Sequence, residues 1–132
     1  MSWVEVFAVL LVSHLAGDFL LQTEWQATHK FGGLARGRAE ARAALVKHVT
    51  TYTLCFVPAL VWLIDSLGWG VLWVAALVAV LHLIQDDGRL LSAYLRRIKR
   101  SDAGPGDMVF VMVDQSVHVL ILFAIALLVA AG

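Results

Sequence analysis

Four long apolar stretches alternate with polar and basic segments along this sequence. The apolar stretches cover about residues 3–22, 44–64, 68–87 and 108–130. Each holds roughly 20 residues, the length that an α-helix needs to cross a hydrocarbon core about 30 Å thick. The pattern therefore predicts an all-α polytopic membrane protein, a four-helix transmembrane bundle within a single integral membrane domain that comprises residues 1–132.

The composition favours a membrane protein over a soluble one. Hydrophobic residues make up 61% of the chain and charged residues only 15%, whereas soluble domains carry about 25% charged residues. The one cysteine, Cys55, excludes an intrachain disulfide and a metal cage built from cysteines. We expect contacts with membrane lipid and no nucleic-acid partner, and the sequence leaves the oligomeric state open.

Basic residues concentrate in the two longer connections, residues 23–43 and 88–107. Both connections lie on the same side of a four-span protein, whereas the short turn at 65–68 on the other side has Asp65 and no basic residue. The positive-inside rule then places the basic loops in the cytoplasm and both termini outside. Four of the five tryptophans fall at predicted outer ends, as in an aromatic belt: Trp3, Trp62, Trp69 and Trp73.

Residues 90–100, within the second basic connection, combine an apolar stripe with basic residues on the opposite arc. Leu91, Tyr94 and Ile98 recur at helical spacing. This pattern is typical of an amphipathic helix that lies at the level of the lipid headgroups. We therefore predict a cytoplasmic interfacial helix beside the bundle.

Histidine and aspartate residues recur inside the apolar stretches at a spacing of four. His14 and Asp18 form one pair, His82 and Asp86 form a second, and the last stretch has a pair in reverse order. On an α-helix this spacing puts both side chains on one face, about one turn apart. With a rise of about 1.5 Å per residue, all of these groups fall in the cytoplasmic half of the predicted bundle. The full set is His14, Asp18, His48, His82, Asp86, Asp114 and His118.

Each ionisable side chain deep in a span costs roughly 2.5–3.5 kcal/mol on insertion scales, so the seven must face inward and be compensated. Four imidazoles and three carboxylates without a thiolate suit two divalent ions, with Zn, Mn or Fe as candidates. The alternative is a polar network that only fixes the register of the helices. Three further residues are expected to support the site or to bind substrate, the last of them at the cytoplasmic mouth: Gln22, Gln115 and Arg89. No catalytic group is predicted beyond a metal-bound water.

Two runs of residues resemble the signatures of a known family. Residues His14–Gln22 read H-x-x-x-D-F-x-L-Q, and residues Asp114–His118 read D-Q-x-x-H. Together with His48 and the His–Asp pair before Arg89, they resemble a bacterial family of small four-span membrane proteins classified as a domain of unknown function. The resemblance implies this architecture in the bacterial inner membrane and these site residues, but no activity. A weaker likeness is to membrane-bound metal-dependent hydrolases.

Four functions are compatible with this pattern. The leading hypothesis is a metal-dependent hydrolase that acts on a phosphorylated, anionic amphiphile at the inner leaflet, where two ions would bridge a water and clamp the phosphoryl group. The second is a transport subunit for divalent metal ions or protons, although the outer halves of the spans offer almost no polar path. The third is a di-iron oxidase, although the sequence lacks the glutamate-rich ligand set that such helix bundles usually carry. The fourth is an accessory membrane subunit with a structural His/Asp network, and experiment must decide whether the protein is an enzyme.

Overall fold

The computed structural model describes all 132 residues, and every regular element is helical, which confirms the predicted all-α class. Two short elements depart from the α-helix: η1 is a π-helix and η2 is a 3₁₀-helix. In chain order the elements are α1 (Trp3–Leu15), η1 (Ala16–Leu20), α2 (Glu24–His29), α3 (Ala39–Cys55), α4 (Val57–Leu67), η2 (Gly68–Gly70), α5 (Val71–Asp86), α6 (Arg89–Arg97) and α7 (Met108–Ala131).

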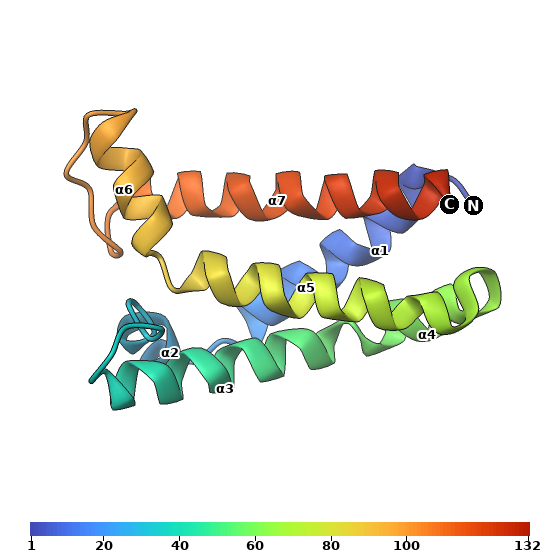
Figure 1. Cartoon of the computed structure of the whole chain (residues 1–132), viewed down its shortest axis with the longest axis horizontal. Helices are drawn as coiled ribbons and strands as arrows, with labels where there is room; N and C mark the ends of the chain where they lie inside the picture. Colours follow the sequence, from blue (N-terminus) through green and yellow to red (C-terminus); the bar gives the residue numbers. More distant parts are fainter.

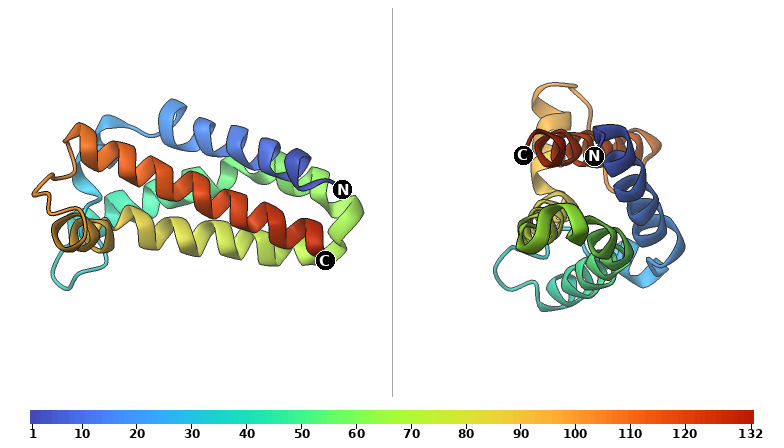
Figure 2. Two further views of the ribbon diagram at one scale, coloured as in Figure 1. Left: turned by 90° about the horizontal axis from the view of Figure 1, so that it is seen from above. Right: turned by 90° about the vertical axis from the view of Figure 1, so that its right-hand side faces the viewer.

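Four helical runs lie side by side along the long axis of the molecule (Figure 1). They are α1, the consecutive helices α3 and α4, α5, and α7. Helix α1 packs against α7, and α3 packs against α5. Helices α2 and α6 lie at one end of this bundle, whereas both termini and the η2 turn lie at the other (Figures 1 and 2). We call these the α2/α6 end and the terminal end.

Three helical segments are long and apolar enough to cross a membrane: Trp3–Leu20, Val57–Asp86 and Met108–Ala131. The second segment combines α4, η2 and α5, and it reverses direction at η2 (Figure 1). Large apolar side chains cover the outside of the bundle; Leu20 is 79% exposed and Trp69 is 86% exposed. Such a surface suits contact with lipid and would be unusual in water. The chain therefore has the character of a membrane protein, as predicted.

Apolar side chains fill the half of the bundle at the terminal end. Leu10, Tyr52, Phe56 and Leu63 are fully buried there, in one core cluster with residues of α5 and α7. Close packing of this kind resists changes of even one methylene group. This core therefore fixes how the four helical runs sit against one another, and so it fixes the positions of the side chains in the other half.

A short break separates α3 from α4 within the second helical run. Helix α3 ends at Cys55 and α4 begins at Val57, because Pro58 has no N–H to donate to the carbonyl oxygen of Leu54 four residues earlier. Phe56, at the break, keeps a near-helical conformation with φ −85° and ψ −9°. The two helices consequently continue in nearly the same direction (Figure 1).

Candidate metal centre

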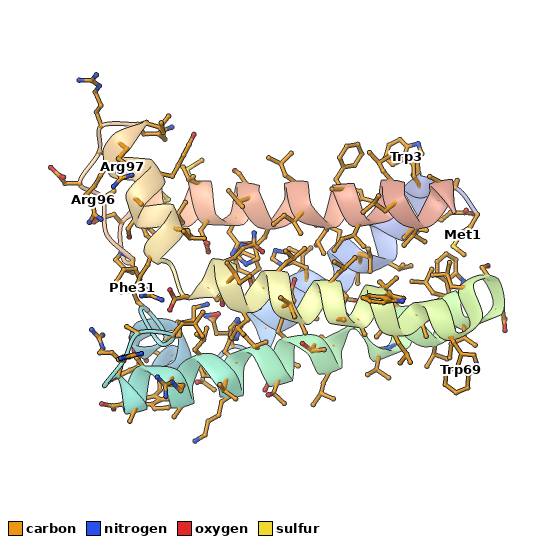
Figure 3. The ribbon with its side chains drawn as sticks, viewed as in Figure 1. Met1, Trp3, Phe31, Trp69, Arg96 and Arg97 are labelled. Carbon is orange, nitrogen blue, oxygen red and sulfur yellow. The ribbon has the colours of Figure 1, made fainter.

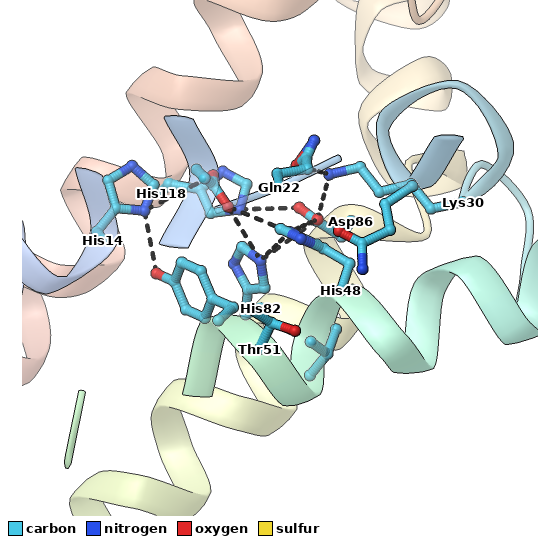
Figure 4. A network of polar contacts seen from close by, with 12 residues as sticks. His14, Gln22, Lys30, His48, Thr51, His82, Asp86 and His118 are labelled. Atoms are coloured by element: carbon cyan, nitrogen blue, oxygen red, sulfur yellow. Dashed lines mark hydrogen bonds and ion pairs between the residues drawn. The ribbon is translucent and has the colours of Figure 1, made fainter. Parts of the chain in front are cut away.

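Six ionisable side chains from four elements meet inside the bundle near its α2/α6 end. Figure 4 shows four of them, His48, His82, Asp86 and His118. The six side chains come from η1, α3, α5 and α7, which the apolar core of the terminal half holds in place. Five of them are buried, and the side chain of Asp114 is 20% exposed. The six are Asp18, His48, His82, Asp86, Asp114 and His118. Of the seven residues that the sequence singles out, only His14 lies beside this cluster rather than within it.

Four of these residues, which we call the four-ligand group, are Asp18, His48, His82 and Asp86. The Nε2 atom of His48 lies 3.2 Å from Asp18 Oδ1 and 2.9 Å from Asp86 Oδ2. The Nε2 atom of His82 lies 3.4 Å and 3.3 Å from the same two oxygens, and the two Nε2 atoms are 3.0 Å apart. A tetrahedral ion at about 2.0–2.1 Å from nitrogen and oxygen ligands separates them by about 3.3–3.4 Å. The group therefore has nearly the spacing of a tetrahedral metal site.

A second set, the three-ligand group, consists of Asp86, Asp114 and His118. The Nδ1–H of His118 donates to the backbone oxygen of Asp114 at 2.8 Å. Its Nε2 atom then faces Asp86 Oδ1 at 3.1 Å. A carbonyl partner on the far nitrogen is the usual way in which proteins orient a metal-binding histidine. Asp86 belongs to both groups and offers a different oxygen to each, so it is the carboxylate placed between two potential ion positions.

His14 belongs to neither ligand group, because both of its ring nitrogens face other partners. His14 and Asp18 remain neighbours across the junction of α1 and η1, with His14 Nδ1 3.7 Å from Asp18 Oδ2, while Asp18 Oδ1 faces the four-ligand group. The Nδ1 atom of His14 lies 3.0 Å from the Tyr52 hydroxyl, and its Nε2 atom lies 3.0 Å from Gln115 Oε1. Gln115 also donates to Asp18 Oδ2 at 3.1 Å. His14, expected as a ligand, thus lies in a hydrogen-bonded chain that orients Asp18, and Gln115 has the supporting position that the sequence predicts.

Tyr52 supports the cluster in a way that sequence reasoning missed. Its ring stacks on the imidazole of His82, with the ring centroids 3.4 Å apart and an interplanar angle of 1°. Gly17 permits this packing, because a Cβ atom at that position would lie 2.6 Å from the Tyr52 ring. A tyrosine in an apolar stretch gives no periodic signal, and the one clue was its spacing of four from His48.

Lys30 is the basic residue that contacts the cluster. In the sequence it follows the run that carries the family resemblance, but sequence reasoning gave it no role at the site. Its ammonium group donates to Asp86 Oδ2 and, at 3.0 Å, to Gln22 Oε1, and its side chain is only 16% exposed. The loop that carries Lys30 is held against the end of α5, where the Leu34 N–H donates to the Asp87 carboxylate at 2.8 Å. Gln22, predicted as a supporting residue, therefore acts on the cluster through Lys30 (Figure 4).

Arg89, expected at the mouth of the site, lies outside it. Its guanidinium group pairs with Asp87, and its side chain is 51% exposed. Gly88, with a φ of 75°, follows the end of α5 in the left-handed conformation that glycine adopts at little cost, and α6 leaves in a new direction. The helical spacing between His82 and Arg89 therefore does not hold in space, and Lys30 takes the place expected for Arg89.

A cavity of about 240 Å³, which we call the entrance cavity, reaches the cluster between η1, the loop after α2 and the start of α7. Its polar lining includes Asp18, Gln22, Lys30, Asp86, Asp114 and Gln115. A small group in this cavity would contact carboxylates of both ligand groups and the Lys30 ammonium. The arrangement therefore gives a reactant of limited size access to a buried cluster.

The unpartnered atoms of the cluster fit a bound cation. Asp18 Oδ1 is buried without a hydrogen bond, a state that costs about 1–3 kcal/mol and more for a charged group. A cation within the four-ligand group would satisfy it. The Nδ1 atoms of His48 and His82 are also buried without a partner, so contacts with the Tyr52 ring orient both imidazoles instead. Imidazole with carboxylate and no thiolate suits Zn, Mn or Fe.

No match to the chain was found among curated proteins or among solved structures. A family model described as a protein of unknown function (DUF3307) matches residues 6–131, which include every member of both ligand groups. The match agrees with the family resemblance of the sequence runs and assigns no activity. The chain therefore belongs to the DUF3307 family of proteins of unknown function.

Proposed function

We propose that this protein is a membrane-embedded metal-dependent hydrolase that acts on a phosphorylated amphiphile. The observation that carries the proposal is the four-ligand group, in which two buried imidazole nitrogens lie 3.0 Å from each other and 2.9–3.4 Å from two carboxylate oxygens. The three-ligand group adjoins it through Asp86. We therefore propose two divalent ions, Zn, Mn or Fe, on either side of the Asp86 carboxylate.

The charge of the cluster supports both the ions and a phosphorylated substrate. With neutral histidines, three carboxylates and the Lys30 ammonium leave an excess of two negative charges, a strong attraction for cations in a region of low dielectric. Two divalent ions would reverse this to an excess of two positive charges. A phosphate monoester carries about −1.5 to −2 charges and would neutralise that excess. An uncharged ester or amide would not.

The residues around the cluster have distinct proposed roles in hydrolysis. Bound divalent ions supply Lewis acidity, which activates water and neutralises charge on a phosphoryl group. Lys30 would hold a phosphate oxygen at the entrance cavity. Gln115 keeps the Asp18 carboxylate oriented, and Tyr52 keeps the His82 ring in place. The apolar core of the terminal half excludes water from the far side of the cluster.

We further propose that all four helical runs cross the membrane, with α3 and α4 together as the second span. Helix α3 is more polar than the three apolar segments, but its threonine hydroxyls are satisfied within the helix. Thr50, Thr51 and Thr53 each donate to the carbonyl oxygen four residues earlier, at 2.8–3.1 Å. Such bonds spare a polar side chain the cost of lipid exposure.

The α2/α6 end is proposed to face the cytoplasm in the bacterial inner membrane, with both termini outside. Arg96 and Arg97 lie at this end, and Trp3 and Trp69 lie at the terminal end (Figure 3). This distribution matches the positive-inside rule and the aromatic belt. Helix α6 buries Leu95 and exposes its arginines, so we propose that it lies in the headgroup region.

Reporter fusions test this topology directly. Fusions after Gly33 and Ala103, in the two basic connections, should read cytoplasmic. A fusion after Gly132 should read periplasmic. The reverse pattern would contradict the placement of the cluster near the inner leaflet.

The decisive experiment measures metal content and phosphate release on detergent-purified protein. Protein supplied with Mn or Zn should hold about two ions per chain and release phosphate from alkyl phosphates, polyprenyl phosphates or phospholipids, and a chelator should abolish the release. His48→Ala should lose the activity. The matched control is His29→Ala, because the His29 side chain is 42% exposed and belongs to neither ligand group. Metal-loaded protein that is inert on every phosphorylated lipid would contradict the proposal.

One alternative has specific support. The Lys30–Asp86 ion pair already compensates one buried carboxylate, as a purely structural network would require. The alternative function is that of an accessory membrane subunit whose His/Asp network is purely structural. It is favoured if metal-free protein is fully folded and binds no divalent ion at micromolar concentration. Transport of metal ions or protons is disfavoured because the apolar core closes the terminal half of the bundle. Movement of metal ions into vesicles that contain the protein would instead support the transport function.

A further inference from the structure

Two cavities of opposite character meet beside the cluster. The entrance cavity is lined by carboxylates, amides and Lys30. A second hollow of about 320 Å³, which we call the apolar groove, lies between α5 and α7 where α6 crosses them, and it is lined mainly by aliphatic side chains and Tyr94. Its volume is at the lower end of the range for sites that hold organic ligands, about 300–1,000 Å³. Gln85 and Asp114 line both cavities, so the groove and the polar site adjoin at these two side chains.

An unpartnered donor marks the junction. The Nε2 atom of Gln85 is buried and has no hydrogen-bond partner. A buried amide without a partner costs about 1–3 kcal/mol, so the structure holds a donor that an oxygen atom of a ligand would satisfy. On the polar side of this donor lies the Lys30 ammonium, and on the other side lie Leu81, Val117 and Ile121 of the groove.

We infer that the apolar groove binds the hydrocarbon chain of a single-headed anionic membrane amphiphile whose headgroup enters the entrance cavity. The groove opens on the outside of the bundle, where Ile84 and Tyr94 are 39% and 45% exposed, so a lipid chain reaches it without leaving the bilayer. Gln85 donates to an oxygen at the junction of chain and headgroup, and Lys30 pairs with the negative charge. The inference deepens the proposed function, and the assignment of the headgroup as a phosphate rests on that function.

Photo-crosslinking tests the groove without any need for catalysis. The probe is a long-chain alkyl monophosphate with a diazirine in its chain, added to the full-length protein in phosphatidylcholine vesicles. Adducts should concentrate on the groove and should disappear in the presence of excess unlabelled alkyl phosphate. Val117→Trp fills the groove and should reduce labelling about tenfold. This is the loss of affinity expected when roughly two methylene groups of the alkyl chain are no longer buried. The same-helix control is Leu120→Trp, because Leu120 is 64% exposed and does not line the groove.

The outcomes separate this inference from the proposed hydrolase. Thermal denaturation at the wild-type temperature in both tryptophan variants shows that the fold is intact, and labelling is compared on that basis. Labelling of the groove that is lost in Val117→Trp supports the inference, even if metal-loaded protein releases no phosphate. The absence of phosphate release would contradict only the proposed hydrolase. The inference that the groove binds a hydrocarbon chain would be contradicted by adducts spread evenly over the lipid-facing surface. Unchanged labelling and unchanged KM in Val117→Trp would also contradict it, and neither result would affect the proposed hydrolase.

Discussion

The two halves of the bundle are built from the same helices but are held together by different forces. At the terminal end, Leu10, Phe56 and Leu63 are fully buried in a core that contains no carboxylate, imidazole or basic group. At the α2/α6 end, the same helices bury histidines against aspartates at 2.9–3.4 Å. Packing suffices for the first half, whereas the second depends on compensation of charge. Stability and chemistry are thus separated along the axis of the bundle.

The largest effect is expected at Asp86, because its carboxylate joins both ligand groups and pairs with Lys30. Removing one partner from a buried ionic cluster costs about 3–5 kcal/mol, so Asp86→Asn should lose both ions and reduce phosphate release by about a thousandfold. Elemental analysis and phosphate assays measure the two losses. Asp65→Asn is the control, since Asp65 is exposed at the terminal end. Equal metal content and equal phosphate release in the two variants would contradict the proposed difference between the two halves.

A cavity in the terminal half should affect stability and leave the chemistry intact. Leu63 is fully buried in the apolar core, and Leu63→Ala should lower the free energy of unfolding by about 2–5 kcal/mol. Metal content and phosphate release per folded molecule should stay at the wild-type level. Denaturation in detergent provides the measurement, with Leu120→Ala as the lipid-facing control. A loss of metal from the folded Leu63→Ala protein would mean that the halves are not separable.

Replacing Lys30 should change substrate binding more than metal content. A hydrogen bond to a charged group contributes about 1.5–3 kcal/mol, so Lys30→Met should raise KM for a phosphorylated amphiphile tenfold or more while the ions remain bound. Steady-state kinetics on metal-loaded protein checks this. Arg89→Met should leave KM near the wild-type value, because Arg89 pairs with Asp87 outside the site. A larger effect at Arg89 than at Lys30 would contradict the placement of Lys30, and not Arg89, beside the cluster.

The smallest effect is expected where the two halves adjoin. A Cβ atom at Gly17 would press on the Tyr52 ring at 2.6 Å, and overpacking of this kind costs about 1–3 kcal/mol. Because Tyr52 stacks on His82, Gly17→Ala should lower both stability and metal affinity. Titration with a divalent ion and thermal denaturation give the two values. Gly106→Ala has open space around it and should change neither.

The bundle and most of the cluster followed from the sequence because both depend on regular helical geometry. A rise of about 1.5 Å per residue sets the depth of a side chain in a helix, so groups at one depth on packed helices meet. Three features did not follow. Tyr52 and Gln115 engage the ring nitrogens of His14, the left-handed Gly88 turns Arg89 away, and a folded loop brings Lys30 to Asp86. Each depends on a local backbone conformation or a distant contact that side-chain periodicity does not encode.

The tight turn at η2 has a consequence for biosynthesis. Three members of the four-ligand group, His48, His82 and Asp86, lie on the two arms of the hairpin that this three-residue turn closes. If both arms cross the membrane as proposed, insertion of the hairpin as one unit would bring these ligands together while the last helix is still being translated. Asp18, made earlier, needs only to dock beside them. The last helix, α7, then adds Asp114 and His118 and completes the three-ligand group.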